Sequence, residues 1–440
     1  MINNDTRVFA KGISVSNDTR ITGLNNNDMI IGSSGAGKTG GYVLPNIMQY
    51  NTSFAIADTK GNLFRKLHEQ LKHHGYTVYL VDFVNPECSD CYNPLDYVNF
   101  DEKTGRYREK DIMTIASALC PDGNISDSPF WTSSARNVIT CLVAFVLEAF
   151  EEKETHNLAS VMQVFRLLGE QAAEQAAKSK SGFTSSIPFL EEWSLFQPES
   201  TAAKYYQNFR PCLPAEKTWG CIMQFVNNAL SAYDFHEAKN LFHTGKSFRI
   251  EELGRRKTAV FLNISDTDRA LDHVVNLFYT QALQQLCAEA DKEKNNRLKI
   301  PVRLILDDFA TNTKIPNFDG IISVIRSREI SVSIILQSLT QLTALYGTAR
   351  ASTILNNCDH VLYLGGTDLE TVRYISKRVR HSMETVMEMP LNRVYYMERG
   401  KKGVLADKLV PYACVTVSTE ETIDQQFDKR TEQIMDVSDL

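Results

Sequence analysis

The sequence predicts an α/β fold with a mostly parallel sheet that is interrupted by one all-helical stretch. Short apolar segments alternate with helical patterns, which is typical of a parallel sheet covered on both faces. This alternation stops between about residues 101 and 245, where convincing strands are missing. A glycine-rich motif also follows a short strand, 28–31, near the start of the chain. Further strands are expected at residues 53–58, 77–82, 258–264, 303–307, 331–336 and 360–364.

The glycine-rich motif reads GSSGAGKT over residues 32–39 and fits the phosphate-loop pattern G-x-x-x-x-G-K-[ST]. Glycines let the backbone N–H groups turn inward around phosphate oxygens, and the helix expected at 40–50 adds partial positive charge at its N-terminus. Lys38 would reach the β- and γ-phosphates, and the Thr39 hydroxyl would ligate Mg²⁺. The alternative is a glycine-rich turn without a ligand. The residues expected to bind ATP with Mg²⁺ are Gly32, Ser33, Ser34, Gly35, Ala36, Gly37, Lys38, Thr39 and Gly40.

A second motif, VRLILDD at 302–308, places two acids after an apolar run. Such a run predicts a buried parallel strand that delivers carboxylates to its C-terminal edge. Asp307 would hold Mg²⁺ directly or through water, and Asp308 would orient or deprotonate the attacking water. Gln337 follows the strand at 331–336 and could hydrogen-bond both a γ-phosphate and a water. The alternative for the two acids is a strand end that faces solvent.

Length and composition set limits on these hypotheses. The chain has 440 residues, enough for two or three domains, and its net charge of −6 gives no global basic character for nucleic-acid binding. The net charge is compatible with a local basic surface. The longest apolar stretch, 138–150, contains Glu148 and is judged too short to span a bilayer. The nine cysteines include one C-x-x-C, Cys88 and Cys91, without a second pair at zinc spacing, which favours reduced cytosolic thiols.

The stretch without strands predicts an all-α domain over residues 101–245, inserted into a nucleotide-binding domain made of 1–100 and 246–440. Within it, Val138, Leu142, Val143 and Val146 recur at helical spacing, which is typical of a core-facing stripe. The tail after residue 419 is acidic and poor in apolar residues. Helices are expected in this stretch at 108–119, 133–150, 158–179 and 217–244.

Several local runs point to one family. They are DTKGN at 58–62, YNPL at 92–95, DDFA at 307–310, KIPNF at 314–318, IRSREIS at 325–331, IILQS at 334–338, LTALYG at 342–347, NNCD at 356–359 and LGG at 364–366. In this order and spacing they resemble the type IV secretion coupling proteins, hexameric ATPases that hand DNA and protein substrates to a conjugation channel. The likeness covers about residues 22–408 and is closest to versions on Gram-positive mobile elements.

The resemblance implies a RecA-like P-loop motor domain, assembled as a ring around single- or double-stranded DNA, with an inserted all-α domain that engages substrate or relaxosome. By position, Lys38 and Thr39 match the phosphate-loop pair, Asp307 the magnesium acid and Gln337 the sensor. Arg326 best matches the arginine that reaches a neighbouring subunit's nucleotide, with Arg328 as second choice. For both arginines a solvated helix end is the alternative.

The chain departs from the family pattern at several places. Family members usually begin with transmembrane helices, whereas this sequence begins just before the motor. Thr59 and Asn62 replace the usual Pro and Glu after the second strand, and Asp308 replaces a Glu that is one methylene longer. A carboxylate set back by about 1 Å can slow a reaction by about 10²-fold. The segment 375–389 is also shorter than the family pattern.

The sequence thus predicts an ATP-hydrolysing motor that moves DNA or a relaxase–DNA substrate into a type IV secretion channel. The expected partners are DNA, relaxosome proteins, channel components and other copies of the chain in a hexamer. The expected location is the cytoplasm or the inner face of the cell membrane. The rival hypothesis is a nucleotide-gated adaptor that recruits substrate and hydrolyses ATP poorly because of Asp308. A small-molecule kinase is disfavoured, because no cluster of lid arginines is evident.

Overall fold

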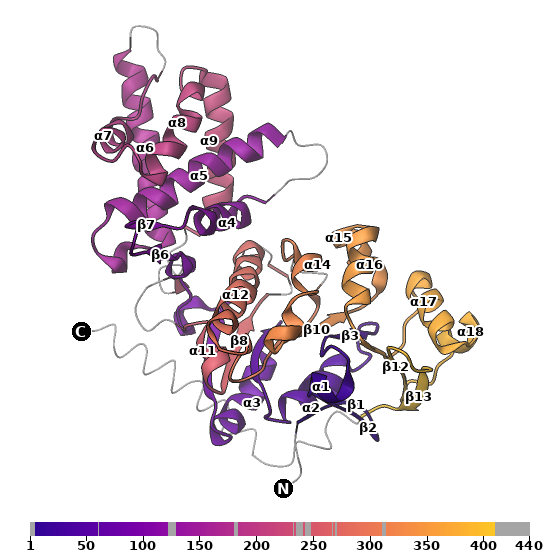
Figure 1. The fold of residues 1–440 in the computed structure, drawn as a ribbon. Coiled ribbons are helices and arrows are strands. Elements are labelled where there is room, and N and C mark those ends of the chain that lie inside the picture. Colours follow the sequence, from indigo (N-terminus) through magenta and orange to yellow (C-terminus); the bar gives the residue numbers. More distant parts are fainter. Residues whose placement is uncertain are drawn as a thin grey trace. The chain divides into compact units, whose positions relative to one another are not determined.

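The computed structural model describes residues 5–59, 61–121, 129–179, 184–231, 233–234, 241–242, 248–265, 267–268, 271–309 and 314–409. The chain forms two compact units (Figure 1). Unit 1 comprises Met1–Val84, Arg249–Arg269 and Ala282–Leu440, and unit 2 comprises Asn85–Phe248 and Ala270–Gln281.

Unit 1 is built on a nine-stranded sheet within the described residues, in the order β13-β12-β11-β3-β10-β9-β4-β8-β5. The seven strands from β11 to β5 run parallel, and β12 and β13 are antiparallel additions at one edge. The predicted α/β fold with a mostly parallel sheet is confirmed. The strands are β3 (Asp28–Ile31), β4 (Ser53–Asp58), β5 (Thr77–Asp82), β8 (Thr258–Asn263), β9 (Val302–Leu306), β10 (Ile330–Leu336), β11 (His360–Tyr363), β12 (Arg393–Glu398) and β13 (Val404–Asp407).

Helices cover both faces of this sheet, because the chain crosses it in two directions. After β3 and β4 the chain moves towards β5, whereas after β9 and β10 it moves back towards β11. Parallel crossovers are right-handed, so the helices of the two sets lie on opposite faces (Figure 1). The first set is η1 (a π-helix, Thr39–Val43), α2 (Leu44–Ile47) and α3 (Asn62–His73). The second set includes α14 (Phe318–Ile321), η6 (Ile325–Arg328), α15 (Leu339–Tyr346) and α16 (Thr348–Asn356).

Among its described residues, unit 1 also contains a two-stranded hairpin and four further helices. They are β1 (Thr6–Ala10), β2 (Ile13–Ser16), α1 (Thr19–Thr22), α11 (Glu252–Arg255), α17 (Leu369–Val379) and α18 (Met383–Met387). The hairpin of β1 and β2, and the pair β12 and β13, are missing from the sequence prediction. These strands are antiparallel, so they carry no crossover pattern that marks them in the sequence.

A buried ionic cluster lies at the amino ends of the central strands. Asp28 is fully buried, and its Oδ2 lies 3.0 Å from Arg7 Nε and 2.8 Å from Arg303 Nη1. The same oxygen accepts a hydrogen bond of 2.5 Å from the hydroxyl of Tyr42, which comes from the π-helix. The cluster therefore connects β1, β3 and β9 with the helix that follows the phosphate loop.

Unit 2 is helical, as the sequence predicts for this stretch. Its elements are η2 (Pro86–Cys88), η3 (Pro94–Tyr97), β6 (Phe100–Asp101), β7 (Arg106–Tyr107), α4 (Glu109–Leu119), α5 (Pro129–Ala149), η4 (Lys153–Thr155), α6 (Leu158–Lys178), α7 (Pro188–Phe196), α8 (Thr201–Phe209), η5 (Arg210–Cys212) and α9 (Glu216–Ser231). The first half of α12 (Asp272–Lys292) belongs to unit 2, and its second half to unit 1. Two details of the prediction are wrong. The short hairpin of β6 and β7 lies in a region expected to lack strands, and α7 and α8 were not predicted.

The apolar helix α5 is longer than the sequence pattern indicated. It has 21 residues, or about 31 Å, because it begins at Pro129, so by length and composition it could cross a membrane. The prediction that this stretch is too short is therefore wrong. However, 67% of its most apolar window is buried, and it packs against α4, α6, α8 and α9 as the core helix of unit 2.

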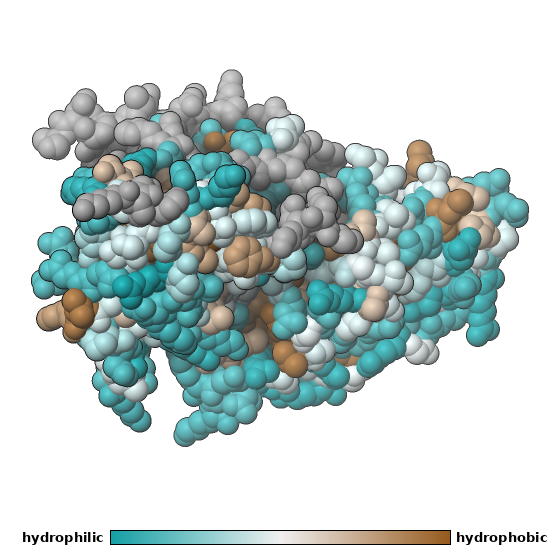
Figure 2. Space-filling model, turned by 90° about the horizontal axis from the view of Figure 1, so that it is seen from above, coloured by the Kyte–Doolittle hydropathy of each residue, from teal (hydrophilic) through white to brown (hydrophobic). Residues whose placement is uncertain are grey.

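On the face in Figure 2, hydrophilic residues predominate and hydrophobic residues form small separate groups.

The part of the sequence prediction that concerns the tail after residue 419 lies outside the described residues. So does part of the helix predicted at 217–244, of which α9 accounts for Glu216–Ser231. Eight of the nine cysteines lie in the described residues, among them Cys88 and Cys91.

Candidate nucleotide-binding site

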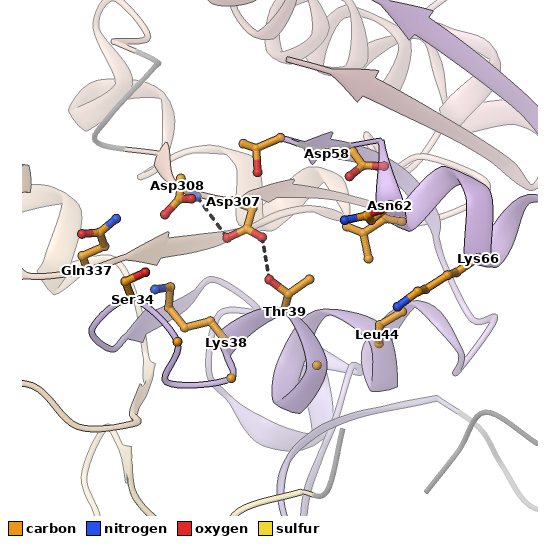
Figure 3. A pocket seen from close by; sticks show the side chains of 15 residues that line it. Ser34, Lys38, Thr39, Leu44, Asp58, Asn62, Lys66, Asp307, Asp308 and Gln337 are labelled. Atoms are coloured by element: carbon orange, nitrogen blue, oxygen red, sulfur yellow. Dashed lines mark hydrogen bonds between the residues drawn. The ribbon is translucent and has the colours of Figure 1, made fainter. Parts of the chain in front are cut away.

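The carboxyl ends of four neighbouring parallel strands bring polar side chains to one edge of the sheet. Gly32 follows β3, Asp307 follows β9, Gln337 follows β10, and Asp58 ends β4. The helices that follow β3 and β10 cover opposite faces, and a crevice therefore opens between these strands at that edge. A cavity of about 360 Å³ lies there (Figure 3). The phosphate loop, both acids and Gln337 line it, so the structure brings together most of the residues that the sequence singled out.

The phosphate loop is held in shape by backbone contacts to the neighbouring strand ends. The Gly32 N–H donates to the Leu336 carbonyl at 3.1 Å, and the Ser33 N–H donates to the Gly365 carbonyl at 2.9 Å. Gly35 and Gly37 have φ of 75° and 84°, a left-handed conformation that only glycine adopts readily. The Lys38 ammonium folds back and donates to the carbonyls of Gly32 at 2.8 Å and Ser33 at 3.2 Å. The lysine therefore lies inside the loop, where a phosphate would take over its hydrogen bonds.

Thr39 and Asp307, far apart in sequence, meet at the floor of the cavity. The Thr39 hydroxyl donates to Asp307 Oδ2 at 3.1 Å, and the Asp308 N–H donates to Asp307 Oδ1 at 3.0 Å. Burial, followed by the charge of Asp308, raises the pKa of Asp307 to about 6, against the opposing effects of Thr39 and Lys38. A carboxylate beside a hydroxyl is the hard oxygen pair that Mg²⁺ prefers. The described residues contain no cluster of three or more His, Cys, Asp or Glu that could hold a metal, so phosphate and water would have to complete the shell.

Asp308 has an unusual backbone for its position. Its φ is 48°, in the left-handed region, where Asp and Asn are tolerated better than other residues with a Cβ. In Figure 3 its carboxylate, the Gln337 amide and Ser34 lie at the same end of the cavity as Lys38. A γ-phosphate held by Lys38 would therefore have a carboxylate and an amide beside it.

The cavity also contains residues that the sequence analysis did not assign to the site. Asp58, Thr59, Asn62 and Lys66 line it, and Asn62 and Lys66 come from the start of α3 (Figure 3). Asp58 accepts a hydrogen bond of 2.9 Å from the Phe64 N–H, which fixes the helix start. The signal that could have identified them is the polar run directly after β4, because that strand ends at the same edge as β9. Lys60, in the middle of this run, lies outside the described residues.

Arg326 and Arg328 lie away from the cavity. Both are in η6, which ends just before β10 begins, whereas Gln337 follows the end of β10. The seven residues of β10 span about 20 Å, so neither arginine can reach the nucleotide site of its own chain. Arg326 is exposed and donates to the Gly23 carbonyl at 2.9 Å, and Arg328 forms an ion pair with Asp291 at 2.9 Å. Any role at a nucleotide would have to be in a neighbouring subunit, and Arg326 is the less engaged of the two.

A sequence model of the family described as type IV secretory system conjugative DNA transfer matches residues 2–388. The chain belongs to this family. Protein VirD4 of Agrobacterium fabrum (strain C58) is 22% identical over 355 residues, which cover 80% of this chain and 49% of VirD4. The type IV secretion system-coupling protein VirD4 of Bartonella quintana is 21% identical over 354 residues, 78% of this chain and 51% of that protein. The chain spans about half the length of the curated relatives it matches.

Solved structures share the fold of this coupling-protein family member. The plasmid coupling protein TrwB in complex with ADP and Mg²⁺ aligns with a TM-score of 0.63 at 13% identity, over 95% of this chain and 91% of TrwB. VirB4 of Thermoanaerobacter pseudethanolicus aligns with a TM-score of 0.54 at 13% identity, over 92% of this chain and 96% of VirB4. At this level of identity the likeness establishes the RecA-like P-loop fold, which confirms the predicted fold class.

Proposed function

We propose that this chain is an ATP-hydrolysing coupling protein that moves DNA or a relaxase–DNA substrate towards a type IV secretion channel. One observation carries the proposal: a phosphate loop, a Thr39–Asp307 pair and Asp308 line one cavity in a member of the conjugative DNA transfer family. The motor would be formed by residues 1–100 and 246–440, and the substrate-engaging helical domain by 101–245. Solved TrwB complexes with ADP and Mg²⁺, and with an ATP analogue, support this choice of ligand.

Each residue would have a defined task in hydrolysis. The loop N–H groups and Lys38 would bind the phosphates, and Thr39 and Asp307 would hold Mg²⁺, which when bound neutralises charge on the phosphates. Asp308 would accept a proton from the attacking water, and Gln337 would orient that water. Arg326 of one subunit would approach the nucleotide of the next, with Arg328 as the second choice. An arginine acting in this way can contribute about 10³- to 10⁵-fold in rate.

This arrangement implies a homo-oligomer, which we take to be a hexamer around DNA. Its partners would be DNA, relaxosome proteins and channel components, and its place would be the cytoplasm or the inner face of the membrane. With a net charge of −6, DNA contact would depend on a local set of Lys and Arg side chains. DNA affinity should then fall steeply with salt.

A second candidate is a nucleotide-gated adaptor that binds ATP but turns it over slowly. The observation that favours it is Asp308, whose short carboxylate stands where the family pattern has a glutamate. The adaptor would use the same phosphate loop, so nucleotide binding does not distinguish the two. Steady-state hydrolysis does: the motor hydrolyses ATP faster when DNA is added, whereas the adaptor stays near zero with and without DNA.

The deciding experiment compares wild type with Lys38→Ala. The substitution removes charge-assisted hydrogen bonds to phosphate, so nucleotide affinity and DNA-stimulated hydrolysis should both fall strongly. Lys72→Ala is the matched control, because this exposed lysine of α3 pairs with Glu69 and does not line the cavity. A Lys38→Ala variant with unchanged affinity and turnover would rule out the assignment of the loop.

A further inference from the structure

A second lysine contacts the phosphate loop from outside the cavity. Lys408 directly follows β13, and its Nζ donates to the Ala36 carbonyl at 2.9 Å. Ala36 and Lys408 do not line the cavity, whereas Gly37 and Lys38 do. The loop is therefore held by one lysine from within and by another from its outer side.

Lys408 is fixed in place before it reaches the loop. Its N–H donates to the Asn392 carbonyl at 2.8 Å, and the carbonyl of the preceding Asp407 accepts from the Lys11 N–H at 2.9 Å. Its Cγ lies 3.9 Å from the point where a Cβ on Gly41 would stand, so the stem runs beside the π-helix. Burial lowers the pKa of Lys408. No carboxylate of the described residues forms an ion pair with it, so the Ala36 carbonyl is its defined polar contact.

The geometry of a peptide bond gives this contact a consequence inside the loop. In a planar trans peptide the C=O and the following N–H point in opposite directions. The Ala36 carbonyl points outward to Lys408, so the Gly37 N–H points to the cavity side. A cation on the carbonyl also polarises the peptide and strengthens that N–H as a donor.

We propose that Lys408 is a positioning residue for nucleotide binding, which fixes the Ala36–Gly37 peptide so that the Gly37 N–H points to the phosphates. The proposal rests on the proposed function, because it requires that the loop bind a nucleotide. Loop N–H groups of this kind bind the α- and β-phosphates, whereas Lys38 reaches the β- and γ-phosphates. Loss of Lys408 should therefore weaken ADP and ATP equally, whereas loss of Lys38 should weaken ATP more than ADP.

The test is equilibrium binding of ADP, an ATP analogue and inorganic pyrophosphate, each with Mg²⁺, to the full chain. Lys408→Met should weaken all three by about five- to tenfold, as expected for one lost hydrogen bond. Lys408→Arg should restore affinity, because it keeps a cationic donor. Lys401→Met is the matched control: this exposed lysine lies between β12 and β13 and pairs with Glu398. The Lys401→Met protein should bind all three ligands as tightly as wild type does.

The melting temperature and the comparison between ligands distinguish a positioning role from a purely structural one and from a nucleoside contact. The melting temperature of Lys408→Met without nucleotide should fall by at most about 4 °C, as expected for one lost hydrogen bond, and a larger drop would overturn the proposal in favour of a structural role. A loss with ADP but not with pyrophosphate would overturn it too, because Lys408 would then contact the nucleoside. If Lys408→Met keeps the affinity of wild type while Lys38→Ala loses affinity, the role of Lys408 is refuted and the proposed function stands. If wild type binds no nucleotide, the proposed function itself fails. Should Lys408→Met not fold, Lys408→Gln keeps a neutral donor and should weaken binding by a smaller factor.

Discussion

Replacing Asp28 by asparagine should destabilise unit 1 strongly. Among the described residues, Asp28 is the one carboxylate that pairs with the two buried arginines Arg7 and Arg303, which are 2% and 3% exposed. Asparagine has almost the same volume, so the change creates no cavity. It removes the negative charge, replaces one acceptor oxygen by a donor NH2 group, and leaves two guanidinium groups in the interior without a counter-charge. Such a loss typically costs about 3–5 kcal/mol in the free energy of unfolding, which is a large part of the usual total of about 5–15 kcal/mol.

The unfolding of the two units can be followed separately. Its three tryptophans, Trp131, Trp193 and Trp219, all belong to unit 2, so tryptophan fluorescence during urea unfolding reports on that unit. Amide hydrogen exchange of β3, β9 and β10 reports on unit 1. Asp28→Asn should speed exchange in these strands and leave the tryptophan transition of unit 2 in place.

The matched control is Asp18→Asn. Asp18 also pairs with an arginine, but its partner Arg20 is 76% exposed, and an exposed pair contributes about 0–1 kcal/mol. Asparagine can also keep the hydrogen bond by which Asp18 caps α1. If Asp28→Asn shifts exchange no more than Asp18→Asn does, the argument from the buried cluster is wrong.

Three more predictions concern catalysis and pH. Asp308→Asn should keep Mg·ATP bound but slow single-turnover hydrolysis by at least about 10²-fold, and Asp308→Glu should speed hydrolysis. Equal rates in wild type and both variants would exclude Asp308 as the water-positioning group. Mixing Arg326→Ala with Lys38→Ala subunits should restore part of the lost ATPase activity, since one interface can hold an intact site; wild-type hydrolysis that ignores protein concentration across the assembly range would contradict a role in trans. Burial lowers the pKa of His360 to about 4, whereas the unfolded chain takes up this proton near 6.5, so His360 should contribute a fall of roughly 3 kcal/mol in the free energy of unfolding as pH drops through that window. Asp307, whose pKa is raised to about 6, contributes in the opposite direction, so the effect of His360 is the difference between wild type and His360→Phe. In denaturant titrations that difference should change by roughly 3 kcal/mol over the window, and a constant difference would exclude this role of His360.

Much of the sheet and the site could be predicted because their signals are local. The strands expected at 53–58 and 77–82 have the boundaries of β4 and β5, and the motif at 32–39 forms the loop after β3. Parallel strands deliver their carboxyl ends to one edge, so polar residues that follow apolar runs meet there whatever the rest of the fold. For this reason the Thr39 hydroxyl lies 3.1 Å from Asp307 Oδ2, although 268 positions separate the two residues in the sequence.

Other features depended on strand register, which the sequence pattern does not specify. The sequence pattern marks Asp28 and Arg303 only as parts of apolar strands, whereas register places Arg303 Nη1 2.8 Å from Asp28 Oδ2, with both side chains buried. The same holds for Lys408, which reaches the phosphate loop only because β13 is the last strand of an antiparallel addition to the sheet.

The sequence by itself therefore determined the chemistry at the carboxyl edge of the sheet: a phosphate loop, two acids and a glutamine, each at the end of a strand. The tertiary structure alone decided which charges lie inside the protein and what holds the loop from outside. The physical reason is the range of the interactions. Loop conformation and strand formation follow from neighbouring residues, whereas a buried ion pair or a lysine on a distant carbonyl exists only once separate strands are packed in one register.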